Sequence, residues 1–386
     1  MKKLLVLAMV LVFAAMPVFS ELTISGEFDY YMINGFDNDD QARFADKWDK
    51  GEVDIKGSIG DYTKMAIELE EDGSWSKFKG TYPEGTPSFN YFRVQSDWGK
   101  FFGLEGIGIS TDIGLNAWET KDKVSFTGFA YEDSDTLDNV IMDKDFGAKI
   151  DLKLADGLVQ PYFALEFDTI AEQQPKTDAA FVDGEAQYLV GAGFDFAKID
   201  LPLWIEAYFM NGQAEDVYTF GAQALYELAI ADYLVTVGGF INGHNNAADD
   251  TGYVWAAAAG FEAFGAKINA AVAGQFGEDY YGEDKYSPLS VFAVDAEYFF
   301  LDWLGVNAGA AFAFGDYKEV QAGDETLQSF EIGLVAKPEK GVCYKLGYIY
   351  VDENVSANQG DLFLTLNTDG NVASESGLYF VTKIDF

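Results

Sequence analysis

The sequence predicts an all-β fold: a transmembrane, antiparallel, up-and-down β-barrel of about 16 to 18 strands, with 18 as the best count. Two observations predict it. Apolar and polar residues alternate along most of the chain, as they do in a strand that has one apolar face. The connections between the alternating segments are short and long in turn, so successive segments are expected to form hairpins.

Residues 1–20 predict a cleaved secretory signal peptide. Two lysines precede an apolar run over 4–15, and a small residue, Ser20, ends the segment. The run is too short to span a membrane comfortably, and no later stretch offers about 20 unbroken apolar residues. Residues 21–386 are therefore expected to form a single barrel domain.

The composition favours a folded, sheet-rich chain. Asp and Glu number 64 against 25 Lys and Arg, and such acidity in a chain poor in aromatics would indicate disorder. Aromatic residues make up 16% of this chain, and they favour strands. A single cysteine, Cys343, allows no intramolecular disulfide. Nucleic acid is excluded as a partner, because a phosphate backbone needs a basic face.

The first alternating segment, 22–32, is about long enough for a tilted strand to cross a bilayer. In it Leu22, Ile24 and Phe28 alternate with polar residues. The same alternation defines further segments at 53–59, 65–69, 146–154, 159–167, 188–196, 201–209, 218–228, 233–241, 253–263, 268–276, 290–300, 304–314, 330–336, 342–350 and 378–386. Two more strands complete the count of 18: one between the connections 72–87 and 98–100, and a fifth strand at 100–109. A count of about 16 stays open, because 124–132 also alternates and 361–367 is ambiguous.

The connections fall into two sets. Tight turns are predicted at 60–61, 98–100, 156–157, 198–200, 231–232, 264–265, 301–303 and 338–340. Long connections, acidic or rich in amides, are predicted at 35–49, 72–87, 169–186, 243–252, 277–288, 315–326 and 352–375. Aromatic residues beside the tight turns are expected to form a girdle at one membrane interface: Trp98, Phe101, Phe102, Phe194, Phe196, Phe264, Phe299, Phe300 and Trp303.

The last strand carries a resemblance to a known class of protein. Phe380, Ile384 and Phe386 share one apolar face of 376–386, and the segment ends on an aromatic residue. This resembles the closing strand of bacterial outer-membrane β-barrels, and the chain as a whole resembles an outer-membrane porin. The resemblance implies that these three residues are an assembly signal for the barrel-assembly machinery. It also implies short periplasmic turns and long extracellular loops.

The same resemblance implies a place and a function. The chain is expected in the cell outer membrane, in contact with lipid, as a homotrimer without a cofactor. It is expected to form a water-filled channel for passive diffusion of ions and small hydrophilic solutes. The trimer contact could use the alanine-rich strands around Ala257 and Ala259, although lipid-facing alanines without consequence are the alternative.

Charged residues at the polar positions of the strands are expected to line the lumen. A charge on the lipid face would cost about 2 to 4 kcal/mol at the membrane midplane. The candidates for the pore lining are Glu68, Arg93, Lys149, Glu166 and Glu206. Because acidic residues outnumber basic ones, the pore is predicted to select cations.

The segment 111–145 is a candidate pore-constricting loop. It follows the predicted fifth strand, 100–109, and in porins a loop at this position folds inward. Its acidic residues include Asp112, Glu119, Glu132, Asp133, Asp135 and Asp138. An ordinary solvated surface loop is the alternative. A ladder of arginines facing these acids is impossible, since the chain has only Arg43 and Arg93.

Other functions and folds have less support. No enzymatic activity is expected. A nucleophile activated by a histidine, or an Asp/His pair that activates water, would have to use His244, the only histidine, which lies in a predicted loop. No acidic loop has calcium-binding spacing, so no metal is expected. A surface adhesin with acidic loops stays open, as does a sugar-selective channel lined by inward aromatics such as Tyr162, Trp204 and Tyr208. The alternative fold is a stack of soluble β-sandwiches.

Overall fold

The computed structural model describes residues 21–35, 44–72, 76–77, 88–121, 141–166, 187–211, 217–245, 251–277, 291–313, 327–351 and 376–385. Its strands are β1 (Glu21–Gly35), β2 (Phe44–Ile59), β3 (Thr63–Asp72), β4 (Ser76–Lys77), β5 (Ser88–Asp97), β6 (Gly108–Glu119), β7 (Ile141–Lys153), β8 (Val159–Glu166), β9 (Tyr188–Asp195), β10 (Leu203–Asn211), β11 (Tyr218–Ile230), β12 (Tyr233–Asn245), β13 (Thr251–Ala263), β14 (Ala266–Gly277), β15 (Val291–Leu301), β16 (Leu304–Ala313), β17 (Leu327–Glu339), β18 (Val342–Val351) and β19 (Ser376–Asp385).

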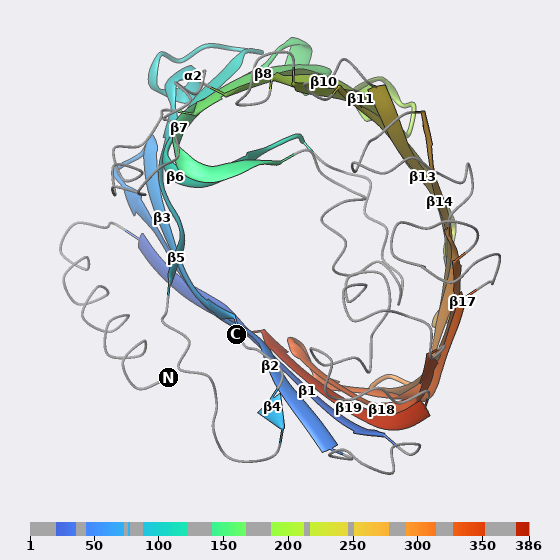
Figure 1. The fold of residues 1–386 in the computed structure, drawn as a ribbon. Helices are drawn as coiled ribbons and strands as arrows, with labels where there is room; N and C mark the ends of the chain where they lie inside the picture. Colours follow the sequence, from blue (N-terminus) through green and yellow to red (C-terminus); the bar gives the residue numbers. More distant parts are fainter. Residues whose placement is uncertain are drawn as a thin grey trace, which may run out of the picture.

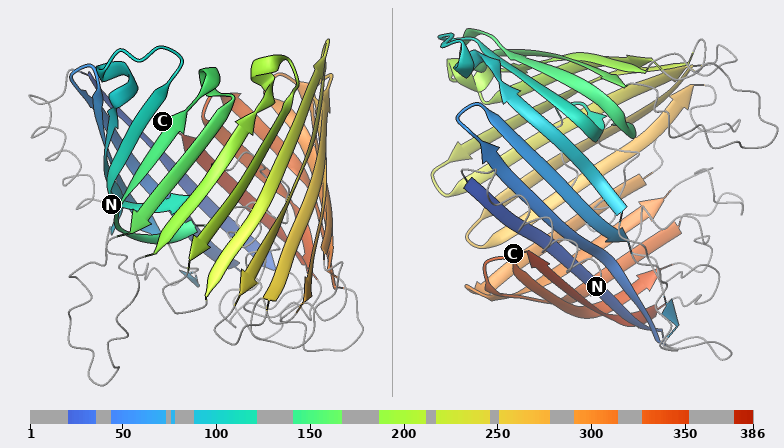
Figure 2. Two further views of the ribbon diagram at one scale, coloured as in Figure 1. Left: turned by 90° about the horizontal axis from the view of Figure 1, so that it is seen from above. Right: turned by 90° about the vertical axis from the view of Figure 1, so that its left-hand side faces the viewer.

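The strands form one closed antiparallel barrel. Each strand pairs with its neighbours in sequence, except that the two-residue β4 pairs only with β2 and leaves β3 to pair with β5. The ring of 18 strands is seen end-on in Figure 1. The strands are steeply tilted in the side views of Figure 2, as closure of a barrel requires. The all-β barrel and its count of 18 are therefore confirmed.

The barrel closes between its first and last strands. β1 pairs with β19 from Glu27 opposite Asp385 to Gly35 opposite Gly377. This pairing confirms the predicted meeting of 22–32 with 378–386 up to Asp385, and Phe386 lies outside the described residues. Closure leaves no unpaired sheet edge. An unpaired edge would expose backbone N–H and C=O groups, which is strongly unfavourable in lipid.

The two faces of each strand differ as the alternation predicts. On β17 the side chain of Ile332 is 62% exposed on the outside, whereas Glu331 is buried on the inside. β19 repeats the pattern, with Leu378 exposed and Tyr379 and Val381 buried. The outer face of the barrel is therefore apolar, and the inner face carries most of the charged residues of the strands.

The turns at one end are tight. Phe264 and Gly265, which join β13 to β14, have φ angles of 52° and 77°, and a two-residue turn with two positive φ angles matches the right-handed twist of a hairpin. The predicted aromatic residues gather at this end, where Trp98, Phe102 and Trp303 are exposed. No helix in the described part of the chain is long and apolar enough to cross a membrane.

A second aromatic band, which the sequence analysis did not predict, lies at the other end of β8 to β14. Ring follows ring there at centroid distances between 5.0 and 6.4 Å. Its members are Phe163, Tyr188, Phe209, Tyr218, Phe220, Tyr253 and Phe276. Two aromatic bands that flank an apolar outer face are the pattern expected where a barrel meets the two interfaces of a membrane.

The prediction of the fifth strand at 100–109 is wrong. A short helix, α2 (Trp98–Phe101), follows β5 instead, because Asp97 caps it by accepting a hydrogen bond from the Lys100 backbone at 2.8 Å. Gly103 and Gly106 then take positive φ angles of 65° and 69°, which end any strand. The fifth strand of the barrel is β6, which begins at Gly108.

The boundaries of the predicted loop 111–145 are wrong for the same reason. Residues up to Glu119 belong to β6, and residues from Ile141 belong to β7. Only 122–140 lie between the described parts. His244 likewise lies within β12 rather than in a loop, with its Nδ1 3.0 Å from the Thr219 hydroxyl.

Candidate functional site

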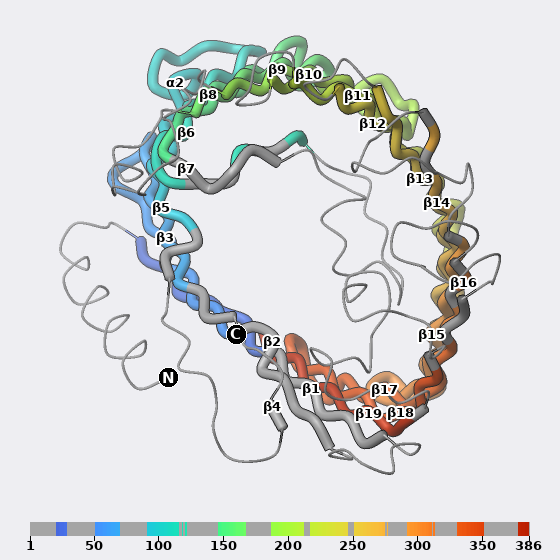
Figure 3. Tube along the Cα trace, in the orientation of Figure 1, coloured from blue at the N-terminus to red at the C-terminus, as the bar shows by residue number. Residues whose placement is uncertain are grey.

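The carboxyl end of β6 leaves the wall and turns into the barrel. In Figure 1 the carboxyl end of β6 and the start of β7 bend away from the ring toward its interior, and in Figure 3 the coloured part of the Cα trace at the end of β6 also lies inside the ring. Trp118, near the end of β6, is only 1% exposed and packs against Tyr162, Leu189 and Tyr208 on the inner wall. Burying a large aromatic side chain contributes roughly 1.5 to 3 kcal/mol, so this contact holds the inward end in place.

Gly147 on β7 makes room for Trp118. A Cβ atom at this position would lie 2.7 Å from Trp118 Nε1 and 2.5 Å from the Leu165 carbonyl oxygen. A Cβ atom does not approach atoms to which it is not bonded so closely. The absence of a side chain at Gly147 therefore allows the indole ring to lie against the wall.

Lys121 ties the inward end to three strands. Its backbone N–H donates to Glu206 Oε1 on β10 at 2.8 Å. Its ammonium group pairs with Asp151 on β7 at 2.7 Å and lies 5.5 Å from the ring centroid of Tyr162 on β8. Charge-assisted bonds of this kind are stronger than neutral ones, so Lys121 holds the carboxyl end of β6 to the wall.

Glu206 is the most buried charged residue of the described chain, with 0% of its surface exposed. It also accepts hydrogen bonds from the Tyr162 hydroxyl and, at 2.7 Å, from the Gln223 amide. A buried carboxylate is tolerated only when donors satisfy its oxygens. Here the donors come from the wall and from the inward end of β6.

Mixed charges line the wall beside this site. Arg93 on β5 lies 3.7 Å from Asp112 on β6, and Gln95 donates to the same carboxylate at 2.8 Å. On β2 and β3 the carboxylate oxygens of Glu52, Asp54 and Glu68 lie within 4.8 Å of one another. Asp54 already accepts hydrogen bonds from Lys56 and from Tyr91 at 2.7 Å, so this acidic cluster is partly neutralised without a metal.

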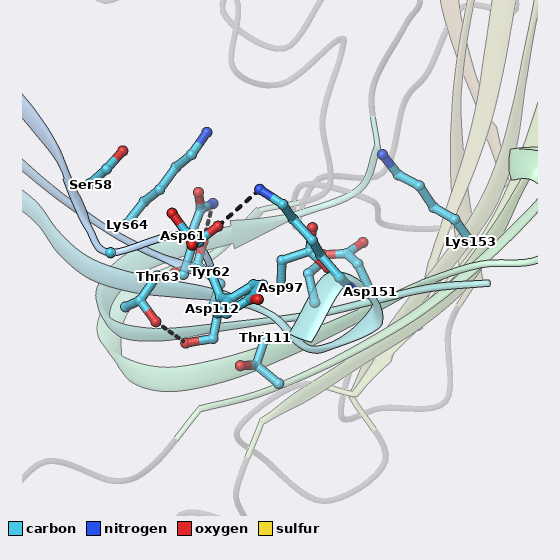
Figure 4. Close-up of a pocket in the computed structure, with 15 residues that line it drawn as sticks. Ser58, Asp61, Tyr62, Thr63, Lys64, Asp97, Thr111, Asp112, Asp151 and Lys153 are labelled. Atoms are coloured by element: carbon cyan, nitrogen blue, oxygen red, sulfur yellow. Dashed lines mark hydrogen bonds between the residues drawn. The ribbon is translucent and has the colours of Figure 1, made fainter. Parts of the chain in front are cut away.

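A cavity of about 410 Å³ opens on the inner wall near the tight turns of β2 to β7. Figure 4 shows Lys64 and Lys153 extending from its two sides, above Asp61, Asp97 and Asp112. Within the described part of the chain, neither lysine forms an ion pair. The cavity therefore presents two available ammonium groups in a setting that also contains carboxylates.

The predicted pore-lining residues fall into two groups. Arg93 and Asp112 meet each other, whereas Lys149 and Glu206 meet around Tyr162, with the Lys149 ammonium 4.9 Å from the ring centroid. Glu68 and Glu166 are also buried on the inner face. The side chain of Glu119 and the acids Glu132, Asp133, Asp135 and Asp138 lie outside the described residues.

Trp118 and Lys121 were not predicted as residues of the site. One signal could have found Trp118: it stands on the polar face of its strand, in step with Asp112 and Gly114. A large aromatic residue at a lumen-facing position needs an apolar surface to cover it. That requirement indicates that the strand does not simply continue along the wall.

The predicted aromatic path for a sugar finds little support in this geometry. Tyr162, Trp204 and Tyr208 do face inward, but all three are buried. The two tyrosines belong to the same buried cluster as Trp118, and Tyr162 donates its hydroxyl to Glu206. A sliding surface needs accessible ring faces.

The wall across from the inward end carries small side chains. On β13 and β14 the inward residues include Ala256 and Ala273, which are buried, and Figure 1 shows these strands on the opposite side of the ring from β6. Some of the alanines that were predicted to face outward therefore face the interior. The small outward patch shrinks to a few residues such as Ala257 and Ala259.

Replacing Gly147 with alanine should destabilise the barrel by about 1 to 3 kcal/mol, as overpacking of a close contact does. The added methyl group would strike Trp118 and the backbone at Leu165. Urea unfolding in liposomes, followed by fluorescence, measures the change. Gly193→Ala is the control, because a Cβ there would meet its nearest atoms at 3.4 Å. Equal stability of the two variants would contradict the seating of Trp118.

Comparisons with known proteins agree on the fold. No family model and no curated protein sequence matches the chain. Among solved structures, OprD of Pseudomonas aeruginosa has a TM-score of 0.51 at 10% identity and covers 96% of both chains. A BenF-like porin from Pseudomonas fluorescens Pf-5 has a TM-score of 0.59 at 10% identity and covers 96% of this chain and 99% of its own.

A third similar structure contains a bound solute. OccK2 (OpdF) of Pseudomonas aeruginosa, in complex with glucuronate, has a TM-score of 0.56 at 8% identity, with coverage of 95% of this chain and 97% of its own. The similar structures are porins rather than enzymes. The closed barrel of 18 strands therefore has the fold of bacterial outer-membrane porins, as the sequence predicts.

Proposed function

We propose that the chain is an outer-membrane channel through which ions and small hydrophilic solutes diffuse passively. The observation that carries the proposal is a closed 18-stranded barrel with an apolar outer face and a charged inner face. A barrel of this strand number encloses more space than its side chains fill. Charged groups in that space attract water, and no covalent step or cofactor is needed.

The inward end of β6 supports a constriction within this channel. It carries Trp118 and Lys121 into the interior on one side, while small residues such as Ala256 and Ala273 occupy the wall across from it. The proposed constricting element is the inward end of β6 up to Lys121, a narrower element than 111–145. Asp112 and Arg93 line the wall beside it.

We expect the pore to prefer cations, because the whole chain contains 64 acidic and 25 basic residues. The described inner wall carries both signs. Its basic residues include Lys56, Lys64, Arg93, Lys149 and Lys153, and its acids include Asp54, Glu68, Asp112, Glu166, Glu206 and Glu331.

Planar-bilayer recordings test both parts of this proposal. Purified protein is expected to produce discrete conductance steps, and the reversal potential in a salt gradient is expected to have the sign of cation preference. Heat-denatured protein is the control. A reversal potential of the opposite sign would overturn the selectivity and leave the channel intact. Intact barrels that give neither conductance nor liposome swelling would favour the adhesin.

A second candidate solute is a small organic anion. The available ammonium groups of Lys64 and Lys153 at the cavity favour it, and the similar OccK2 was solved with glucuronate. Added glucuronate should then reduce the single-channel current, and Lys64→Gln with Lys153→Gln should abolish that reduction. Glucose, which has no charge, is the matched control solute.

We propose a homotrimer, although fewer alanines face outward than the sequence suggested. Ala257 and Ala259 face outward near Gly239 and Ala270, and this small patch could let two barrels approach closely. We also propose that the barrel lies in the lipid of the outer membrane and is inserted there by the barrel-assembly machinery. In this proposal Phe380, Ile384 and Phe386 act as the assembly signal. Phe380 stacks on Tyr344 of β18 at 6.4 Å, a contact compatible with that role.

A further inference from the structure

We propose that Glu206 is a latch that holds the inward end of β6 against the wall and so sets the width of the pore. In this proposal Glu206 is a positioning residue and touches no solute. The proposal rests on the proposed channel function for its consequence, although the latch itself can be tested without any conductance measurement.

One side chain, Glu206, joins the wall to the inward segment, which is the chain from Trp118 to Lys121 at the carboxyl end of β6. Glu206 projects from β10, and two of its three donors belong to the wall: the Gln223 amide on the neighbouring strand β11, and the Tyr162 hydroxyl on β8, two strands away on the other side. The third donor is the backbone N–H of Lys121, from the inward segment itself. The first two hold the carboxylate still, and the third holds the segment to it.

The donor from the inward segment is a backbone group. Replacing the Lys121 side chain would remove its ion pair with Asp151, but the N–H that reaches Glu206 would remain. Proline at position 121 would remove that N–H and leave the bonds of Glu206 to Tyr162 and Gln223 in place. The two substitutions therefore separate the latch from the ion pair.

The latch depends on accepting oxygens rather than on charge alone. Glutamine at position 206 keeps one oxygen, which can still accept from Lys121 and Tyr162. Its new amide group would face Gln223, whose own Oε1 has no hydrogen-bond partner in the described chain and could accept from it after a flip of the Gln223 amide. Glu206→Gln should keep the latch closed, whereas Glu206→Ala should open it.

Glu331 provides a matched control. It is also a buried inward carboxylate, on β17, and it accepts a hydrogen bond from the Asn307 amide at 2.8 Å. Its partner Asn307 lies on the neighbouring strand β16, far around the ring from β6. Glu331→Ala therefore removes a buried carboxylate of the same kind without touching the inward segment.

The experiment measures how accessible position 120 is to a thiol reagent. Thr120 is buried and directly precedes Lys121. Thr120→Cys is made in a Cys343→Ser background, and the rate of its reaction with a charged methanethiosulfonate is measured in folded, liposome-inserted protein. Glu206→Ala and Lys121→Pro should each raise this rate by about tenfold or more, because losing even one hydrogen bond to a buried charged group shifts an equilibrium by that order. Glu206→Gln and Glu331→Ala should change it less than about twofold. Lys121→Ala, which removes the ion pair with Asp151 but keeps the backbone N–H, should raise it less than Lys121→Pro does.

Conductance recorded on the same samples separates the two proposals. Faster labelling together with larger single-channel conductance in Glu206→Ala and Lys121→Pro supports the latch and its role. Unchanged labelling in these variants overturns the latch, whatever the conductance. Faster labelling in protein that conducts nothing, wild type included, supports the latch and overturns the channel. If Glu206→Ala does not fold, Lys121→Pro decides alone, because it leaves the wall intact.

Discussion

Val381→Pro should prevent the barrel from closing. Val381 lies in the middle of β19, opposite Lys345 on β18 and Tyr31 on β1. Its N–H points toward one of these two strands, and because β19 is paired on both sides, this N–H belongs to a hydrogen-bonded ladder. Proline supplies no N–H, and an unsatisfied backbone group in lipid costs several kcal/mol. Each 1.4 kcal/mol shifts an equilibrium about tenfold, so the folded fraction should fall by well over tenfold.

Gel mobility without heating measures the folded fraction, since a closed barrel migrates differently from the unfolded chain. Val381→Ala is the control: it removes most of the same buried side chain and keeps the backbone N–H. It should lower stability and still fold. A proline variant that folds as well as the alanine variant would mean that β19 is not paired on both sides.

The architecture could be predicted because one physical rule governs every strand. A strand between lipid and water must alternate, and it does so from Leu22 in β1 to Ile384 in β19. The alternation of short and long connections then orders the strands into hairpins. The seam between β1 and β19 follows from these two rules alone.

The site could be predicted only in part, because its deciding contacts are not periodic. Lys149 and Glu206 were predicted to face inward from their places on alternating strands, whereas Asp112 was predicted to lie in the constricting loop. Nothing in the alternation indicates that the chain after Asp112 leaves the wall, since that depends on the packing of Trp118 into a space opened by Gly147. A count of charges likewise cannot tell a solvated lumen carboxylate from one that is fully buried.

The displaced fifth strand shows how a local rule can override a periodic one. Phe101 and Ile109 fit an alternating pattern, but Asp97 caps a helical turn just before them. Glycines with positive φ angles then complete a connection that projects beyond the wall. An aspartate three residues before a lysine is a weak signal in a sequence, so the alternation led to the wrong boundary.

Val237→Arg should destabilise the barrel by about 2 to 4 kcal/mol if the outer face contacts lipid. Val237 is 49% exposed on the outer face of β12, and its cross-strand neighbours are Tyr226 and Ala259. An arginine there would place its charge in the apolar part of the membrane near the middle of the strand. Urea unfolding in liposomes measures the loss of stability.

Thr236→Arg is the matched control, one residue away on the opposite face. Its side chain would point inward and face Glu227 across the β11–β12 pair, where an opposite charge is favourable. This variant should fold with nearly wild-type stability. If both substitutions are tolerated equally, the outer face does not contact lipid, and a soluble barrel would replace the membrane channel. If only Thr236→Arg is damaging, the assignment of the two faces is reversed. The difference between these two neighbours therefore tests the one assumption on which lumen, constriction and latch all depend.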